Sequence, residues 1–117
     1  MALDTVQDYI DRARVLLLDQ VPPYRYSEVD LVENLNMGVL EARRLRPDLL
    51  KSYFRSSLPD FSTSSMAAAV NIDPQYRVAF VYYICGMSQL RDDENVQDSR
   101  AVTFLNKFTA QLLSIAA

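Results

Sequence analysis

An unbroken apolar run from Val78 to Cys85 constrains the fold of this chain more than any other feature. Every residue in the run is apolar or tyrosine. The run follows Asp73-Pro74, which is typical of a helix start, with aspartate as N-cap and proline in the first helical position. Apolar residues continue at Met87 and Leu90, so we predict a helix over 74–92 rather than a short strand. A helix that is apolar around its whole girth is covered on several sides, so the rest of the chain should pack around it.

Two amphipathic helices are predicted before this central one. The first spans residues 4–19, with Asp4 or Thr5 as its N-cap, and it ends before Pro22-Pro23 because proline lacks an amide donor. The second begins at Ser27 with a near-capping box and ends before Pro47. A fourth helix, from residue 98 or 99 to 114, follows the central one after a short connection, so these two helices should pack as antiparallel neighbours.

Residues 51–73 show neither helical nor strand periodicity. Irregular connections longer than about 12–15 residues are uncommon in compact domains unless they are functional or disordered. The stretch is rich in serine, yet it contains Tyr53, Phe54 and Phe61, which a flexible linker does not need. Extended at about 3.3 Å per residue, it could reach out and return over roughly 35 Å and touch a neighbouring subunit.

These segments together predict an all-α fold. We expect a small four-helix bundle with a long irregular arm or loop between the second and third helices. The predicted organisation is one domain over residues 1–117, with a helix pair at 4–46, the arm at 51–73 and a second helix pair at 74–115.

The residue counts weaken most enzymatic interpretations. The 117-residue chain has no histidine, one cysteine and two glycines. It therefore lacks the usual acid–base side chain near neutral pH, cannot form an internal disulfide or a zinc knuckle, and has no glycine-rich phosphate loop. We predict no enzymatic activity, no metal and no cofactor. Cys85, inside the apolar run, is expected to be a buried structural thiol, as in a reducing compartment.

The charge balance argues against stable binding of duplex DNA. The chain has 12 basic and 15 acidic residues and a formal net charge of −3, whereas DNA-binding proteins usually carry a basic face. The longest apolar run is far shorter than the roughly 20 residues of a membrane span. The N-terminal residues do not resemble an export signal, so neither a membrane nor secretion is expected.

The segment before the second helix is a candidate for protein contacts. Tyr26 precedes the Ser27 cap and can pack against Leu31 as a hydrophobic staple. This leaves Tyr24 and Arg25 for a neighbour, and both residue types are enriched in interface hot spots.

The basic cluster of Arg43, Arg44 and Arg46 has two interpretations. The arginines either interact with the C-terminal end of the helix dipole or pair with acidic groups of a partner. With the aromatic residues of the 51–73 stretch, the predicted interface residues are Tyr24, Arg25, Arg43, Arg46, Tyr53, Phe54 and Phe61.

The order of these motifs resembles that of tailed-phage head–tail adaptor (connector) proteins. Residues Tyr24–Asn36, with the sequence YRYSEVDLVENLN, are similar to the R-[YF]-S-D-x-x-L-[LV]-x-x-L-N pattern that opens the second helix of those proteins. Leu40–Asp48 is similar to the segment that closes that helix. Leu90–Glu94 and Asp98–Ala101, before an aromatic-rich last helix, resemble the C-terminal helix pair. The likeness covers most of the chain and is weakest across residues 51–73.

This resemblance implies a non-enzymatic virion protein that is made in the host cytoplasm and located at the head–tail interface. It implies a ring, commonly twelvefold, that binds the portal protein, extends the DNA channel and docks the tail, nozzle or stopper protein. DNA would pass through the ring without sequence-specific binding. The alternative is a small helical regulatory or DNA-binding module. A helix-turn-helix needs a turn of about three or four residues, and the stretch between the second and third helices is much longer.

Overall fold

Four α-helices form the framework of the computed structural model, which describes residues 3–48, 60–70, 72, 74–90 and 98–113. The helices are α1 (Val6–Leu17), α2 (Glu28–Leu45), α3 (Arg77–Leu90) and α4 (Asp98–Leu113), and two short 3-10 turns, η2 (Thr63–Ser65) and η3 (Pro74–Tyr76), precede α3. The prediction of an all-α, four-helix fold with a long loop between the second and third helices is confirmed.

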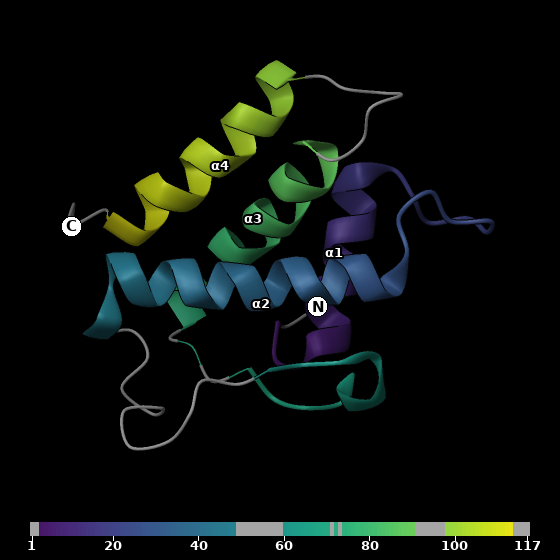
Figure 1. Ribbon diagram of the computed structural model, residues 1–117, viewed down its shortest axis with the longest axis horizontal. Helices are drawn as coiled ribbons and strands as arrows, with labels where there is room; N and C mark the ends of the chain where they lie inside the picture. Colours follow the sequence, from purple (N-terminus) through teal and green to yellow (C-terminus); the bar gives the residue numbers. More distant parts are fainter. Residues whose placement is uncertain (1–2, 49–59, 71, 73, 91–97, 114–117) are drawn as a thin grey trace.

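Helix α3 occupies the centre of the molecule and packs against each of the other helices (Figure 1). Most of its apolar run is buried as predicted, including Phe80, Ile84 and Cys85, whereas Val78 at the start of the run is 36% exposed. The first turn differs from the prediction, because Pro74 lies in the 3-10 turn η3 and the α-helix begins only at Arg77. Asp73, the predicted N-cap, lies outside the described residues.

The contact between α3 and α4 is the most extensive in the fold, and the two helices run antiparallel as predicted (Figure 1). The ring of Phe80 meets Phe108 edge to face with centroids 5.7 Å apart, while Tyr82, further along α3, stacks on the earlier Phe104 at 5.9 Å. The backbones approach closely at Gly86, where an added Cβ would lie 2.8 Å from Cγ of Leu105. A larger residue at this position would push the two helices apart.

The helix starts follow local sequence signals. Of the two candidate caps of α1, the structure uses Thr5, whose Oγ1 accepts a hydrogen bond from the Asp8 amide at 3.3 Å. The Asp8 carboxylate accepts in return from the Thr5 amide at 3.1 Å, which completes a capping box. At the start of α2, Oγ of Ser27 accepts from the amide of Asp30 at 3.1 Å. The predicted cap at Ser27 is therefore confirmed.

Residues 60–70, in the C-terminal half of the predicted arm or loop, fold back on the chain itself below α2 (Figure 1). The amides of Val6 and Gln7 donate to the carbonyls of Ala68 at 3.1 Å and Met66 at 2.9 Å. The first amides of a helix have no partner within it, so this segment satisfies groups at the start of α1. The side chains of Phe61, Val70 and the nearby Ile72 are buried in the core.

Candidate functional site

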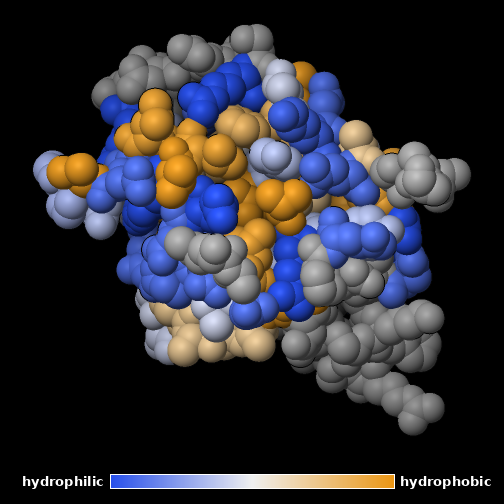
Figure 2. Space-filling view, turned by 180° about the vertical axis from the view of Figure 1, so that it is seen from behind, coloured by the Kyte–Doolittle hydropathy of each residue, from blue (hydrophilic) through white to orange (hydrophobic). Residues whose placement is uncertain are grey.

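The connection between α1 and α2 forms a protruding apolar corner, which we call the corner tip (residues 18–25). Leu18 is 83% exposed and Val21 is 77% exposed, and Pro22, Pro23 and Tyr24 are exposed as well. The tip extends beyond the helices in Figure 1 and at the left edge of Figure 2, where hydrophobic atoms lie at its end. Large apolar side chains on a protrusion of this kind are typical of a contact surface.

A buried carboxylate fastens the base of the corner tip. Asp19 is only 7% exposed, and its carboxylate accepts hydrogen bonds from the Arg25 amide at 2.8 Å, the Tyr26 amide at 3.0 Å and Nη1 of Arg14 at 2.9 Å. The Arg14 guanidinium also donates to the Tyr26 carbonyl at 3.0 Å and lies 4.0 Å from the ring centroid of Tyr24. A buried charge with this many partners holds the connecting chain in one conformation.

Leu18 adopts an unusual backbone conformation for its residue type. It ends α1 with φ 57° and ψ 41°, in the left-handed region, where helices usually end with glycine or asparagine. For an L-residue with a Cβ this conformation costs roughly 1–2 kcal/mol. A leucine that is strained and also almost fully exposed contributes little to the stability of the subunit, so its side chain is available for a contact outside it.

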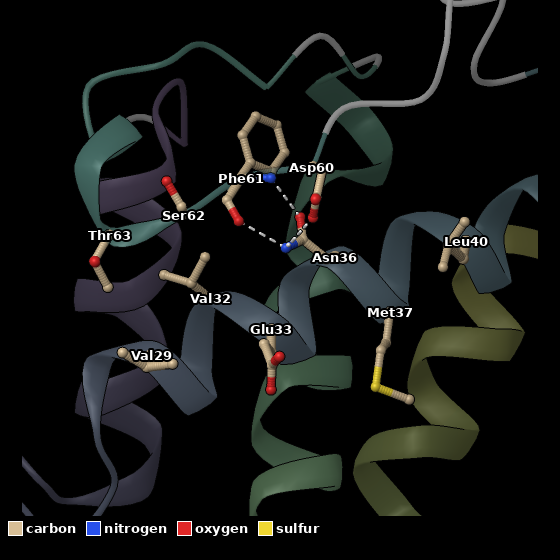
Figure 3. Close-up of a pocket in the computed structure, with 10 residues that line it drawn as sticks. All are labelled: Val29, Val32, Glu33, Asn36, Met37, Leu40, Asp60, Phe61, Ser62 and Thr63. Atoms are coloured by element: carbon tan, nitrogen blue, oxygen red, sulfur yellow. Dashed lines mark hydrogen bonds between the residues drawn. The ribbon is translucent and has the colours of Figure 1, made fainter.

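A second apolar surface lies along α2, which we call the α2 groove. It has a volume of about 380 Å³ and is lined by residues of α2 and by loop residues 60–63 (Figure 3). Its floor includes the buried side chains of Val32 and Phe61, and Val29, Met37 and Leu40 line it with exposed side chains. The remaining lining residues are Glu33, Asn36, Asp60, Ser62 and Thr63.

Asn36 holds the loop against α2 and so shapes the groove. Its Nδ2 donates to the Phe61 carbonyl at 2.8 Å, and its Oδ1 accepts from the Phe61 amide at 2.8 Å. Nδ2 also donates to the Asp60 carboxylate at 3.2 Å (Figure 3). These bonds leave two carboxylates beside the groove, those of Glu33 and Asp60, and neither forms an ion pair with another residue in the described part of the chain.

Three of the predicted interface residues fall at these two surfaces. Tyr24 and Arg25 have exposed side chains on the corner tip. Phe61 lines the α2 groove, but it is only 8% exposed because its ring packs into the core. A role for these residues at an interface stays a prediction, and Tyr53 and Phe54 lie outside the described residues.

The two predicted arginines lie elsewhere, at the C-terminal end of α2. Arg43 is exposed. Arg46 forms an ion pair with Asp48 at 2.9 Å, donates to the Leu112 carbonyl of α4 at 2.5 Å and lies over the ring of Tyr76. The bond to Asp48 and a smaller contribution from Tyr76 raise the pKa of Arg46. Arg46 thus joins the ends of α2 and α4 within one subunit, and Arg44, between these two arginines, pairs with Glu41.

Sequence reasoning missed the network around Asp19 and the α2 groove. A signal for the network exists in the sequence, since an aspartate directly after a helix and before Pro-Pro can accept amide hydrogen bonds from the turn. The groove has no such local signal, because it forms where a distant loop meets α2.

The described residues offer no obvious centre for chemistry. No group of three or more His, Cys, Asp and Glu residues lies close enough to hold a metal ion in this part of the chain. Cys85 is fully buried with its Sγ 3.6 Å from the Ala13 carbonyl, and burial raises its pKa to about 12. A thiol with such a pKa is a poor nucleophile near neutral pH. Within the described residues, no helix combines the length and apolar character that a bilayer crossing needs.

No protein-family model, curated protein or solved structure matches this chain. The function therefore has to be inferred from the surfaces described above and from the motifs of the sequence.

Proposed function

We propose that the protein is a structural subunit of a tailed-phage virion, a head–tail adaptor that forms a ring below the portal. The observation that supports this function best is the presence of two different apolar surfaces, the corner tip and the α2 groove, on one small subunit. The resemblance of Tyr24–Asn36 and Leu40–Asp48 to adaptor motifs indicates which kind of assembly these surfaces would serve, the head–tail connection of a virion. In this role the protein performs no chemistry and extends the DNA channel between portal and tail.

A ring needs two different surfaces on every subunit. Head-to-tail contacts join one patch to another and produce rings when the rotation closes, whereas twofold dimers use the same patch on both copies. The corner tip and the α2 groove are such a pair of distinct patches. The net charge of −3 suits a subunit that lets DNA pass, because strong phosphate binding requires clustered lysine and arginine.

Co-expression with the portal protein of the same virus tests this function. Native mass spectrometry and negative-stain microscopy of the purified mixture should show many copies of the chain in a ring on the portal. A chain that stays monomeric or dimeric and never joins the portal would contradict the adaptor function. The alternative, a regulatory DNA-binding module, predicts salt-sensitive binding to duplex DNA in an anisotropy titration, which the adaptor should lack at physiological salt.

A further inference from the structure

We infer that the free chain pairs with a second copy of itself through the exposed face of α2, with the two helices antiparallel about a twofold axis at the level of residue 38. The α2 groove of each copy then receives apolar side chains of the other copy. This inference goes beyond the proposed function, because it concerns the chain before it meets a portal.

The charges of α2 are divided between its two halves. Glu28 and Glu33 lie in the first half, whereas the basic residues, Arg43 and Arg44, lie in the last turn. The acidic residue of the second half, Glu41, forms an ion pair with Arg44. Two parallel α2 helices place like charges side by side, while two antiparallel ones place each acidic half beside a basic end and also oppose their macrodipoles. The charge pattern therefore favours a second α2 that runs in the opposite direction.

Arg43 and Glu33 are the charges available for this contact. Both side chains are exposed, and neither forms a hydrogen bond or an ion pair with another residue in the described part of the chain. Asp60 adds a second carboxylate at the groove, where it accepts a hydrogen bond from Asn36. An arginine from a second copy therefore meets two carboxylates that have no cation among the described residues of their own subunit.

The surface of α2 that this contact uses is continuous. Val29, Glu33, Met37 and Leu40 follow one another at spacings of three or four residues, which places them on one face of the helix (Figure 3). Arg43 continues the row three residues after Leu40. The groove beside the row has a volume of about 380 Å³, at the lower end of the range of about 300–1,000 Å³ for binding pockets. This volume suits a few side chains rather than a whole helix.

The spacing of Glu33 and Arg43 sets the register of the pair. Ten residues span about 15 Å along an α-helix, and residue 38 lies midway between the two charges. With the twofold axis at that level, Arg43 of each copy lies beside Glu33 of the other, so both ion pairs form at once. Met37 and Leu40, which are 46% and 58% exposed, then lie next to the axis and become buried against the second copy.

A twofold pair closes on itself. Both copies use the same patch, so no further copy joins through it, whereas head-to-tail contacts continue into a ring or a filament. In the proposed ring the α2 groove takes part in a head-to-tail contact, and the pair has to separate before that contact forms. The pair thereby keeps free subunits from polymerising until another partner displaces the second copy.

Self-cross-linking of single-cysteine variants tests the register. In the pair, the two copies of residue 37 are about 3 Å apart along the helix axis, whereas the two copies of residue 29 are about 27 Å apart. Full-length Met37→Cys, treated with a short bismaleimide, should therefore give at least about tenfold more covalent dimer than Val29→Cys. Both positions are exposed on the same helix, and the native Cys85 is buried and does not compete. Equal yields from the two variants overturn the antiparallel pairing.

A charge exchange adds a test that misfolding cannot imitate. Arg43→Glu and Glu33→Arg each place like charges at both ion pairs of a homodimer, so each should weaken self-association at least about tenfold in analytical ultracentrifugation. A mixture of the two variants forms a heterodimer with both ion pairs restored, and native mass spectrometry should show it in excess over either homodimer. Lys107→Glu, at an exposed position on α4, is the control and should leave self-association unchanged. A mixture without excess heterodimer overturns the pairing of Arg43 with Glu33.

The outcomes separate this inference from the proposed function. A chain that is monomeric at every concentration yet forms a ring on the portal overturns the inference and leaves the adaptor function standing. A dimer that responds to the charge exchange, in a chain that never joins the portal, supports the inference and overturns the adaptor function. A dimer that Val21→Glu dissociates and Arg43→Glu does not uses the corner tip instead of α2, and the inference falls.

Discussion

The corner tip and the α3–α4 contact are held together in opposite ways. At the α3–α4 contact, the ring of Phe108 packs against those of Phe80 and Tyr83, with centroid distances of 5.7 and 4.8 Å. At the corner tip, the apolar side chains face outward, and a buried polar network around Asp19 fixes the backbone. The first region stabilises the folded subunit. In the second region the apolar side chains stay exposed to solvent and add little to that stability.

This difference indicates where stability and assembly should separate. Burial of apolar area in the α3–α4 contact contributes to the free energy of folding directly. The network at the tip acts on the conformation of residues 18–26, and the exposed side chains there gain burial only in a complex. Mutations in the two regions should therefore change different measurements.

The largest loss of folding stability is expected for Phe108→Ala in α4. The ring is 2% exposed and lies against both Phe80 and Tyr83, so its removal leaves a cavity and should lower the free energy of unfolding by about 3–5 kcal/mol. Urea unfolding followed by circular dichroism measures this change. Asn106→Ala on the exposed side of the same helix is the control and should stay within about 0.5 kcal/mol of the wild type.

A smaller effect is expected for Arg14→Met at the base of the tip. The substitution keeps the apolar stem but leaves the Asp19 carboxylate without its cation, although the Arg25 and Tyr26 amides still donate to it. We expect a loss of about 2–3 kcal/mol in urea unfolding. Amide chemical shifts should change mainly in residues 18–27. A loss below about 0.5 kcal/mol would show that the network does not stabilise the corner.

Leu18→Gly should separate stability from assembly most clearly. Glycine adopts the left-handed conformation without the steric cost of a Cβ, and little burial is lost because Leu18 is exposed. We expect the isolated chain to be unchanged or stabilised by up to about 1 kcal/mol. The number of copies that assemble on the portal, counted by native mass spectrometry, should nevertheless decrease. A clear loss of stability in thermal unfolding would mean that the Leu18 side chain supports the subunit itself.

The smallest change in stability is expected for Asp8, a half-buried counterpart of the buried Asp19. Hydrogen bonds from the Thr5 and Asp4 amides lower its pKa below the ordinary value of 3.8. A lowered pKa in the folded state means that the carboxylate stabilises the fold above 3.8 and that this contribution disappears as the pH falls through the lowered pKa. Asp8→Asn should therefore reduce thermal stability slightly near neutral pH and not at all in strong acid. An equal difference at both pH values would contradict the role of the charge.

Much of the helical framework could be predicted from the sequence because its signals are local. The spacing of apolar residues, the caps Thr5 and Ser27 and the prolines after α1 and α2 involve residues only a few positions apart. The start of α3 was less accurate, because Pro74 is equally compatible with the 3-10 turn that the structure shows. The length of the loop was predictable, whereas its path was not.

The candidate site was predicted only in part for the same reason. Tyr24 and Arg25 stood out because they precede a helix cap. For Arg46 the sequence suggested an interaction with the helix dipole or with acidic groups of a partner, and the structure adds a contact with the Leu112 carbonyl on α4, far away in the sequence. This contact depends on the tertiary packing, which brings the C-terminal ends of α2 and α4 together.

The sequence by itself determined that this chain is all-α, that α3 lies at its centre and that α1 ends before the Pro22-Pro23 pair. These properties depend on periodicity and on interactions within one or two helical turns. Only the tertiary structure decided that residues 60–70 return to the start of α1 and that Asn36 joins Phe61 beside the α2 groove. The physical reason is that free helix amides and buried side chains find partners through the packing of the whole chain, which no short stretch of sequence encodes.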